Sequence, residues 1–306
     1  MLVVTNDLAG RTEADAVQAA LDVLLVAGRV ERVTCSSVDD LDRALDVRNG
    51  RTLVVVGGDG SLHTMARKLW QRGEAADCVV GLIPLGTGND FARGVGIPLD
   101  PVEAARALLA GVVTPLDLVV DDEDGVVVNA VHVGAGAEAA IAARPLKPWL
   151  RIAAFPIGGV LAGLRVKGWR LRVHVDGVRV ASGRRRVLMV GVSNAPSIAG
   201  GTAELGPGAN PADGRLDVTV SFATGPLARV GYALALRRGR HPDRDDVRQL
   251  TGTTVAVSGE PFHVNADGEL TGPVTARTWR VEPGAWRMLL PADSPTLAVS
   301  AQVMSP

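Results

Sequence analysis

Two glycine-rich loops carry the residues best suited to chemistry. Residues 57–61 read Gly-Gly-Asp-Gly-Ser after the apolar run 53–56, and residues 86–90 read Gly-Thr-Gly-Asn-Asp after the apolar run 79–83. Glycines allow tight turns and close backbone approach, and a helix that starts in such a loop points N–H groups at an anion. Asp59 would repel phosphate unless a divalent cation lay between them. The pattern favours a loop for a Mg²⁺-nucleotide, and the alternative is an ordinary glycine turn.

The surrounding elements predict that both loops lie at one edge of a parallel sheet. Strands are expected at the apolar runs 2–5, 30–35, 53–56, 79–83 and 116–120, and helical spacing lies between most of them. Ser61 is expected to cap one helix, Ser37 with Asp40 a second, and Asp100 a third that starts at Pro101. This alternation indicates a doubly wound α/β domain, which binds ligands at the carboxyl ends of its strands.

The pattern changes after about residue 120, where strands dominate. They are expected at residues 126–133, 169–175, 178–181, 187–193, 216–222, 253–257, 262–265 and 278–281. Asp176-Gly177 predicts a tight hairpin, and helices are expected near residues 149–164 and 227–238. We therefore expect an α/β domain over residues 1–120, a mainly antiparallel β domain over 121–291, and a tail over 292–306 that packs back on the first domain.

Composition narrows the function classes. The chain has 306 residues, 47% of them hydrophobic and 21% charged, as in soluble globular proteins. The net charge of -1 gives no bulk basic field for nucleic acid. Cys35 and Cys78 are the only cysteines, which favours a reducing, cytoplasmic compartment over a disulfide framework. The longest apolar stretch, 152–164, is too short to span a bilayer.

The loops and two later segments together resemble the diacylglycerol kinase catalytic family, which includes sphingosine, ceramide and bacterial lipid kinases. The resemblance rests on residues 57–61 and 84–93, on Asp-Gly-Arg-Leu-Asp at 213–217, and on Asp-Gly-Glu at 267–269. These blocks occur in the family's order and cover most of the chain. The resemblance implies an ATP-binding α/β domain like that of NAD kinases and a β-sandwich domain, with catalysis between them.

The resemblance also implies roles for individual residues. Asp59 would orient the phosphates and the catalytic Mg²⁺, and Glu269 would be the general base that accepts the proton of the substrate hydroxyl. Asp90 and Asp117 would belong to an acidic cluster, and Asp213 would bind a structural Mg²⁺. The carbonyl groups of Asn210 and Arg215 would complete that metal site. The residues that would hold ATP are Asn6, Gly10, Thr34, Gly57, Gly58, Asp59, Gly60, Ser61, Leu62, His63 and Thr87.

Some residues depart from the family pattern or have a plainer interpretation. Asp7 stands where proline is usual, Ser61 replaces a commoner threonine and His63 a frequent asparagine. Without the other motifs, Glu269 and Asp213 would be read as solvated turn residues, because Asp-Gly pairs commonly form turns. Thr87 could equally cap the short helix that follows it.

The expected function is transfer of the γ-phosphate of ATP to a lipid hydroxyl, most readily that of diacylglycerol, with Mg²⁺ as cofactor. The alternatives are an NAD kinase-like enzyme, which shares the Gly-Gly-Asp-Gly loop, and a lipid-binding regulator with little turnover. The expected partners are a lipid substrate and the inner face of a membrane, and the sequence leaves a homodimer open. The basic clusters 184–186 and 237–240 are either solvated ends of elements or contacts for anionic lipid head groups.

Overall fold

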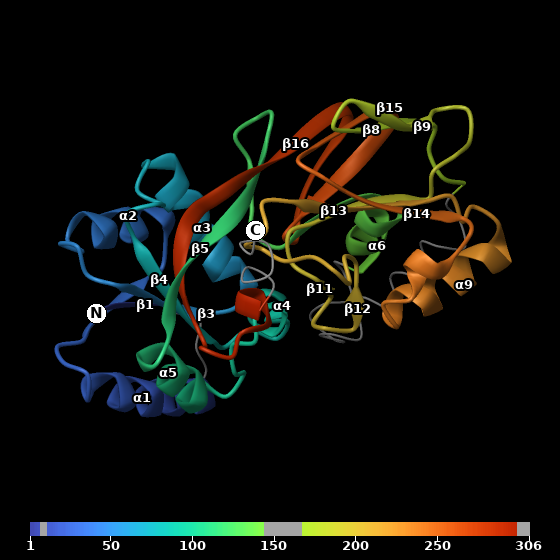
Figure 1. The fold of residues 1–306 in the computed structure, drawn as a ribbon. Coiled ribbons are helices and arrows are strands. Elements are labelled where there is room, and N and C mark those ends of the chain that lie inside the picture. Colours follow the sequence, from blue (N-terminus) through green and yellow to red (C-terminus); the bar gives the residue numbers. More distant parts are fainter. Residues whose placement is uncertain (7–10, 144–166, 299–306) are drawn as a thin grey trace, which may run out of the picture. The chain divides into compact units, whose positions relative to one another are not determined.

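The computed structural model describes residues 1–6, 11–143 and 167–298, and the chain forms two compact units (Figure 1). Unit 1 comprises residues 1–118 and 283–306, and unit 2 comprises residues 119–282. The chain thus returns to unit 1 at Pro283, earlier than the tail that the sequence led us to expect from residue 292. The expected helix at 149–164 and the last residues, 299–306, lie outside the described part.

Unit 1 is built on a parallel sheet in the strand order β2-β1-β3-β4-β16. Its strands are β1 (Leu2–Asn6), β2 (Glu31–Cys35), β3 (Leu53–Gly57), β4 (Val79–Pro84) and the last residues of β16 (Glu269–Leu290). Residues 53–56 of β3 are all buried, as expected for a strand covered on both faces. At the edge, β16 adds Arg287 and Met288 beside Val79 and Val80 of β4.

Helices cover both faces of this sheet. Unit 1 contains α1 (Arg11–Leu25), α2 (Val38–Asp46), α3 (Asp59–Gln71), α4 (Asp90–Gly94) and α5 (Pro101–Leu109). Helices α1 and α5 pack side by side (Figure 1). Leu108 of α5 occupies the space where a Cβ on Gly81 of β4 would lie. The predicted caps are confirmed at two helices. The Asp100 side chain accepts hydrogen bonds from Val102 N and Glu103 N, and Ser37 and Asp40 form a capping box.

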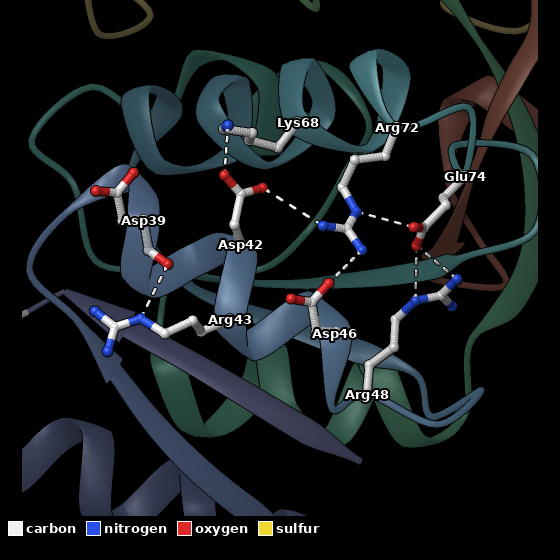
Figure 2. Close-up of polar contacts among 8 residues, drawn as sticks. All are labelled: Asp39, Asp42, Arg43, Asp46, Arg48, Lys68, Arg72 and Glu74. Carbon is white, nitrogen blue, oxygen red and sulfur yellow. Dashed lines mark hydrogen bonds and ion pairs between the residues drawn. The ribbon is translucent and has the colours of Figure 1, made fainter.

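Ion pairs join α2 to α3. Figure 2 shows that Lys68 of α3 reaches Asp42 of α2 at 2.7 Å, and that Arg72, which follows α3, reaches Asp46 at 2.7 Å. Glu74 accepts from both Arg72 and Arg48, each at 2.9 Å. Single exposed ion pairs contribute little, but a network with shared partners fixes relative orientation better than isolated pairs. It steadies the two helices whose first turns lie beside the glycine loop.

Two predictions about helix starts are wrong. Helix α3 begins at Asp59 with Gly58 as its N-cap, so Ser61 lies inside the first turn instead of capping it. Thr87 does not cap α4, because the N-cap residue there is Asn89. The glycine loop is therefore shorter than the sequence pattern suggested, and Asp59 belongs to the helix.

Unit 2 is an antiparallel β-sandwich. Its elements are β5 (Val112–Asp121, which begins in unit 1), β6 (Val126–Val127), β7 (Ala130–Gly134), α6 (Ala135–Ala143), β8 (Leu171–Val175), β9 (Val178–Ser182), β10 (Met189–Ser193), β11 (Ser197–Ile198), β12 (Ala203–Glu204), β13 (Leu216–Ser221), α9 (Pro226–Arg237), η3 (His241–Asp243), β14 (Val247–Gly252), β15 (Thr254–Ala266) and the first part of β16. Strands β14, β13, β10, β7 and β15 follow one another with antiparallel pairing. Alternating valines of these strands form the core around the fully buried Trp279.

Several expected strands differ in extent. Residues 253–257 and 262–265 form most of one strand, β15, whose register with β16 shifts between Ser258 and Phe262. Residues 278–281 are a small part of the long strand β16. The hairpin at Asp176-Gly177 is confirmed, because both residues have positive φ and Val175 pairs with Val178.

The segment after β16 is tied to α4 by a buried hydrogen bond. Ser294 Oγ donates to Val95 O at 2.7 Å, and Ser294 is buried. Ser294→Ala leaves that carbonyl without its hydroxyl donor and should lower the free energy of unfolding by about 1 to 2 kcal/mol. Urea denaturation measures the change. Asp293→Ala, at the exposed neighbouring position, is the control and should stay near wild type. Equal stability of both variants would contradict the role of this bond.

Candidate active site

The two glycine loops of unit 1 are in direct backbone contact. Leu85 N donates to Gly57 O at 3.0 Å, which continues the pairing of β3 with β4 into the loops. A Cβ on Gly58 would lie 2.8 Å from Gly86 Cα, and a Cβ on Gly86 would lie 2.6 Å from Gly58 Cα. No side chain fits at either position. The loops therefore need glycine because each backbone occupies the space of the other's side chain.

Asn89 closes the second loop. Its backbone is left-handed, with φ of 52°, and its side chain is buried. Asn89 Oδ1 accepts from Gly86 N at 3.0 Å, and Asn89 Nδ2 donates to Gly86 O at 2.7 Å. This role of Asn89 was not predicted from the sequence. The available signal was an asparagine after Gly-Thr-Gly, since asparagine tolerates the left-handed conformation and bonds nearby backbone.

Asp59 connects the two loops. It is the first residue of α3 and is half-buried, and its Oδ1 accepts from Phe91 N of α4 at 3.1 Å. This bond orients the carboxylate at the sheet edge where β3 and β4 end. A carboxylate held at a helix N-terminus among backbone N–H groups has the chemistry expected of a residue that acts on a phosphate-bound cation.

A cavity of about 450 Å³ lies beside the first loop in unit 1. Its lining combines polar groups with an apolar floor from Val4, Leu41, Val55, Val56 and Met65. The polar lining comprises Thr5, Ser36, Ser37, Gly58, Gly60, Ser61 and Thr64, together with Cys35. The first turns of α2 and α3 border it, and its size is in the range of pockets for small ligands and cofactors. Such a site suits a nucleoside whose phosphates face helix N-termini.

Only some of the expected nucleotide-binding residues line this cavity. Gly58, Gly60 and Ser61 line it, and the hydroxyl of Thr34 lies 3.3 Å from that of Thr5. The side chains of Leu62 and His63 are buried in unit 1 and leave only backbone groups for a ligand. Gly57 ends β3, Asp59 lies between the lining residues, and Thr87 is exposed on the second loop. Asn6 ends β1, while Gly10 lies outside the described residues.

Two further acids of unit 1 occupy different settings. Asp90 is the first residue of α4 and is half-buried. Asp117 is buried in β5, where its Oδ1 accepts from Gly284 N at 2.8 Å. Gly284 has φ of 60°, so Asp117 stabilises a bend in β16 that favours glycine.

Glu269 lies in unit 2 immediately after a tight turn. Asp267 and Gly268 have φ of 48° and 91°, and Ala266 pairs with Glu269 across the hairpin of β15 and β16. Glu269 is exposed as the first residue of β16. The hairpin geometry sets the backbone direction of this residue and leaves its carboxylate accessible to solvent.

Asp267 anchors this hairpin. Its carboxylate accepts from Val128 N at 2.6 Å and from Asn129 N and Ala130 N, each at 3.0 Å. In return, Asp267 N donates to Ala130 O at 3.1 Å. These bonds tie the turn to the segment between β6 and β7. The aspartate of the Asp-Gly-Glu block therefore has a structural function, which was not predicted from the sequence.

The polar surroundings of the hairpin extend to β7. Asn265 Oδ1 accepts from Gly268 N at 2.9 Å. Burial lowers the pKa of His132 on β7 to about 4, although the nearby Asp267 carboxylate acts in the opposite direction. His132 is consequently neutral near pH 7, and it adds no positive charge beside the turn that carries Glu269.

Asp213 lies in a turn with a second carboxyl group near it. Its Oδ1 accepts from Arg215 N at 2.9 Å, and its own N–H donates to Asn210 O at 3.4 Å. Burial raises the pKa of Asp213. Burial also raises the pKa of Asp217 on β13, and the charge of Asp213 adds to that rise. Two partly desolvated carboxylates that repel one another fit a bound cation, which would relieve both effects.

This metal site would rest on few side chains. Within residues 1–6, 11–143 and 167–298, no group of three or more His, Cys, Asp and Glu side chains is arranged to hold a metal. A site at Asp213 would depend on carboxylate and backbone carbonyl oxygens, which are the hard ligands that Mg²⁺ prefers. The expected carbonyl donors, Asn210 and Arg215, flank Asp213 in the same turn.

Comparison with known proteins defines the class. The family model of the diacylglycerol kinase catalytic domain matches residues 1–120, and that of the YegS C-terminal NAD kinase beta sandwich-like domain matches residues 129–290. The fold is also that of a diacylglycerol kinase crystal structure from Bacillus anthracis, with a TM-score of 0.70 at 18% identity over 94% of this chain and 96% of that one. This is the fold and domain pair of a lipid kinase.

Sequence identity to two relatives identifies the family. A protein named probable lipid kinase YegS-like from Stenotrophomonas maltophilia is 33% identical, covering 95% of this chain and 93% of the relative. Another of that name from Pseudomonas aeruginosa PAO1 is 35% identical, covering 97% of this chain and 96% of the relative. The chain belongs to the YegS-like lipid kinase family.

The contact between the loops predicts opposite effects for two glycines of one motif. Gly58→Ala pushes the loops apart and should lower the free energy of unfolding by about 1 to 3 kcal/mol. Gly60 lies in the first turn of α3 with nothing within 4 Å of a built Cβ. Gly60→Ala should therefore raise the free energy of unfolding by about 0.5 to 1 kcal/mol. Urea denaturation of both variants measures the contrast, and a harmless Gly58→Ala would contradict the close approach.

Proposed function

We propose that the protein transfers the γ-phosphate of ATP to a lipid hydroxyl, with diacylglycerol as the acceptor and phosphatidic acid as the product. One observation carries this proposal: the Asp59 carboxylate is held between two glycine loops, beside a cavity at the carboxyl edge of a parallel sheet. Ligands of open α/β sheets bind at that edge. The membership in a lipid kinase family supports a lipid acceptor.

The glycine loops supply the nucleotide site of this proposal. The base and ribose occupy the cavity lined by Thr5, Ser37 and Met65, and the phosphates follow backbone N–H groups of residues 58–61. Thr34 contributes at the edge of the site and Thr87 from the second loop. Leu62 and His63 take part only through their backbone, because their side chains are buried.

Asp59 holds the cation that accompanies the nucleotide. Mg²⁺, when bound, neutralises charge on the transferring phosphoryl group, which is the main requirement of this reaction. Asp90, at the start of α4, belongs to the same acidic surroundings, whereas Asp117 acts through the bend at Gly284. The Asp59 carboxylate and the phosphates are both negatively charged and would repel one another. A cation between them removes this repulsion, so the site fits Mg²⁺.

Glu269 acts as the general base in this proposal. A hydroxyl is a weak nucleophile, and a carboxylate within hydrogen-bond reach accepts its proton as the transition state forms. Glu269 has an accessible carboxylate on a hairpin fixed by Asp267. Asp213, with the carbonyl groups of Asn210 and Arg215, would hold a second Mg²⁺, which would link the residues of the turn before β13.

The proposed cellular location of the enzyme follows from its proposed lipid substrate. No helix within the described residues is long and apolar enough to cross a membrane. We propose that the enzyme is cytoplasmic and works at the inner face of the membrane, where its lipid substrate resides. The proposal needs no nucleic acid partner, and it accommodates either a monomer or a homodimer.

An NAD kinase-like activity is the second candidate, because the model that matches residues 129–290 describes an NAD kinase beta sandwich-like domain. A lipid-binding protein with little turnover is the third. Incubation with γ-labelled ATP and Mg²⁺, with either diacylglycerol or NAD, separates these functions. The proposal expects label in phosphatidic acid. Label in NADP, or lipid binding without label transfer, would reject it in favour of the corresponding alternative.

Glu269→Gln removes the proposed base and keeps its size. We expect kcat to fall by a factor of about 10² to 10⁴, the usual contribution of a positioned general base. ATP affinity, measured by calorimetry, should change little because the nucleotide site lies in unit 1. Glu204→Gln, on the exposed β12 residue of the same unit, is the control. Full activity of Glu269→Gln would remove this residue from the mechanism.

Asp267 should affect activity beyond its effect on stability, and the chain offers a matched control. Asp176 anchors another Asp-Gly hairpin in a similar way, because its Oδ1 accepts from Thr253 N and Thr254 N at 2.9 and 2.8 Å. Asp267→Asn and Asp176→Asn should each lower the free energy of unfolding by about 1 to 3 kcal/mol. At temperatures where both variants are folded, only Asp267→Asn should also have a lower kcat, because its turn carries Glu269. Equal kcat values in the two variants would contradict the positioning role.

A further inference from the structure

Helix α9 of unit 2 (Figure 1) exposes an apolar stripe to solvent. The exposed fractions are 89% for Leu227, 56% for Val230 and 53% for Leu234. These residues follow helical spacing and therefore lie on one face. Large apolar side chains that gather on one exposed helix face mark an interaction surface more often than scattered single residues do.

Packing fixes the direction in which this stripe points. The opposite face of α9 carries the buried Tyr232, and Ala228 and Leu236 pack against the same apolar cluster. This cluster also contains Leu205 and Ala223. Because the helix is anchored on that side, Leu227, Val230 and Leu234 cannot turn inward without disrupting the cluster.

Exposed arginines lie at the C-terminal end of the stripe. Arg237 and Arg238 are exposed at its C-terminal end, and Arg240 follows. Before the helix begins, the Arg185 guanidinium lies 4.7 Å from the centre of the Phe222 ring, and Arg185 is also exposed. The basic cluster 237–240 thus continues directly from α9, while Arg185 of the cluster 184–186 contacts Phe222, which precedes the helix in the chain.

Few carboxylates oppose this charge. Helix α9 contains no Asp or Glu. The nearest acids along the chain are Asp243, Asp245 and Asp246. Asp243 pairs with Arg240 at 3.5 Å and Asp246 with Arg244 at 2.7 Å, whereas Asp245 is exposed and Glu204 lies beside Gly239. Since the whole chain has a net charge of -1, the positive surface around α9 is a local feature.

We propose that this α9 surface, consisting of Leu227, Val230, Leu234, Arg237 and Arg238, docks on a membrane rich in anionic phospholipids. The apolar side chains enter the boundary between head groups and acyl chains, and the arginines contact phosphate groups. Charge complementarity selects this occupant, because an apolar stripe on a helix without acids, with exposed arginines at its C-terminal end, matches an anionic lipid surface. The inference rests on the proposed function, which requires access to a membrane lipid.

Vesicle cosedimentation tests the apolar stripe. Full-length protein is mixed with vesicles of phosphatidylcholine, alone or with phosphatidylglycerol. Leu227→Glu combined with Leu234→Glu should weaken binding to the phosphatidylglycerol-containing vesicles by about tenfold or more. Val178→Glu is the matched control, because Val178 is 69% exposed in the same unit but lies on β9. Equal binding by the double variant and wild type would overturn the proposal.

The arginines have a separate readout. Arg237→Gln combined with Arg238→Gln should weaken binding to phosphatidylglycerol-containing vesicles about tenfold and flatten its dependence on salt, with little effect on phosphatidylcholine vesicles. Sedimentation velocity of wild type and the Leu227/Leu234 variant measures whether a second copy of the chain binds to the stripe instead of a membrane. If these substitutions only separate a dimer and leave vesicle binding unchanged, the stripe is an interface between copies and the proposal fails.

Activity measurements distinguish this failure from failure of the proposed function. The Leu227/Leu234 variant should lose phosphorylation of diacylglycerol in vesicles and keep it for short-chain diacylglycerol in detergent micelles. Equal loss in micelles and vesicles would place the effect in the kinase itself and overturn the docking role. Vesicle binding that needs the stripe, in a protein without kinase activity, would uphold docking and reject the kinase.

Discussion

The close approach of Gly58 to Gly86 is the constraint on which the candidate nucleotide site depends. Two strand ends can bring their following loops into contact only if neither residue carries a side chain. Once the loops touch, α3 and α4 begin side by side, and Phe91 N is within reach of Asp59. A single steric requirement thus sets the direction of the carboxylate, and the hydrogen bonds of Asn89 hold the second loop in the conformation that this contact needs.

In unit 2, too, a backbone constraint sets the direction of a candidate catalytic carboxylate. The turn before Glu269 is short because Asp267 and Gly268 adopt positive φ, and it is fixed because one carboxylate accepts from consecutive backbone N–H groups. The candidate catalytic acids lie at the start of an element, Asp59 at the start of α3 and Glu269 at the start of β16. The side chain that secures the turn at Glu269 is its sequence neighbour Asp267, whereas the Asp59 carboxylate is oriented by Phe91 N of α4.

The sequence alone could predict features that depend on residues close together in the chain. Apolar runs predicted β1, β2, β3 and β4, Asp100 and Ser37 predicted helix starts, and Asp176-Gly177 predicted a hairpin. The run 116–120 was also expected in the parallel sheet, but it belongs to β5, which pairs with β6 and β16. It could not predict features that depend on distant residues. The last part of β16 joins the sheet of unit 1 beside β4, and the bend at Gly284 depends on Asp117 far away in the chain. Ser61 was assigned a capping role because it is a good cap in isolation, but the loop contact lets α3 start at Asp59. The pairing of Gly58 with Gly86 has no local signal beyond the glycines themselves.

The most direct test is a crystal structure with Mg²⁺ and a non-hydrolysable ATP analogue. We expect the phosphates to lie along the backbone of residues 58–61, with the cation near the Asp59 carboxylate. A nucleotide bound elsewhere, or a cation that the Asp59 carboxylate does not approach, would contradict the central claim.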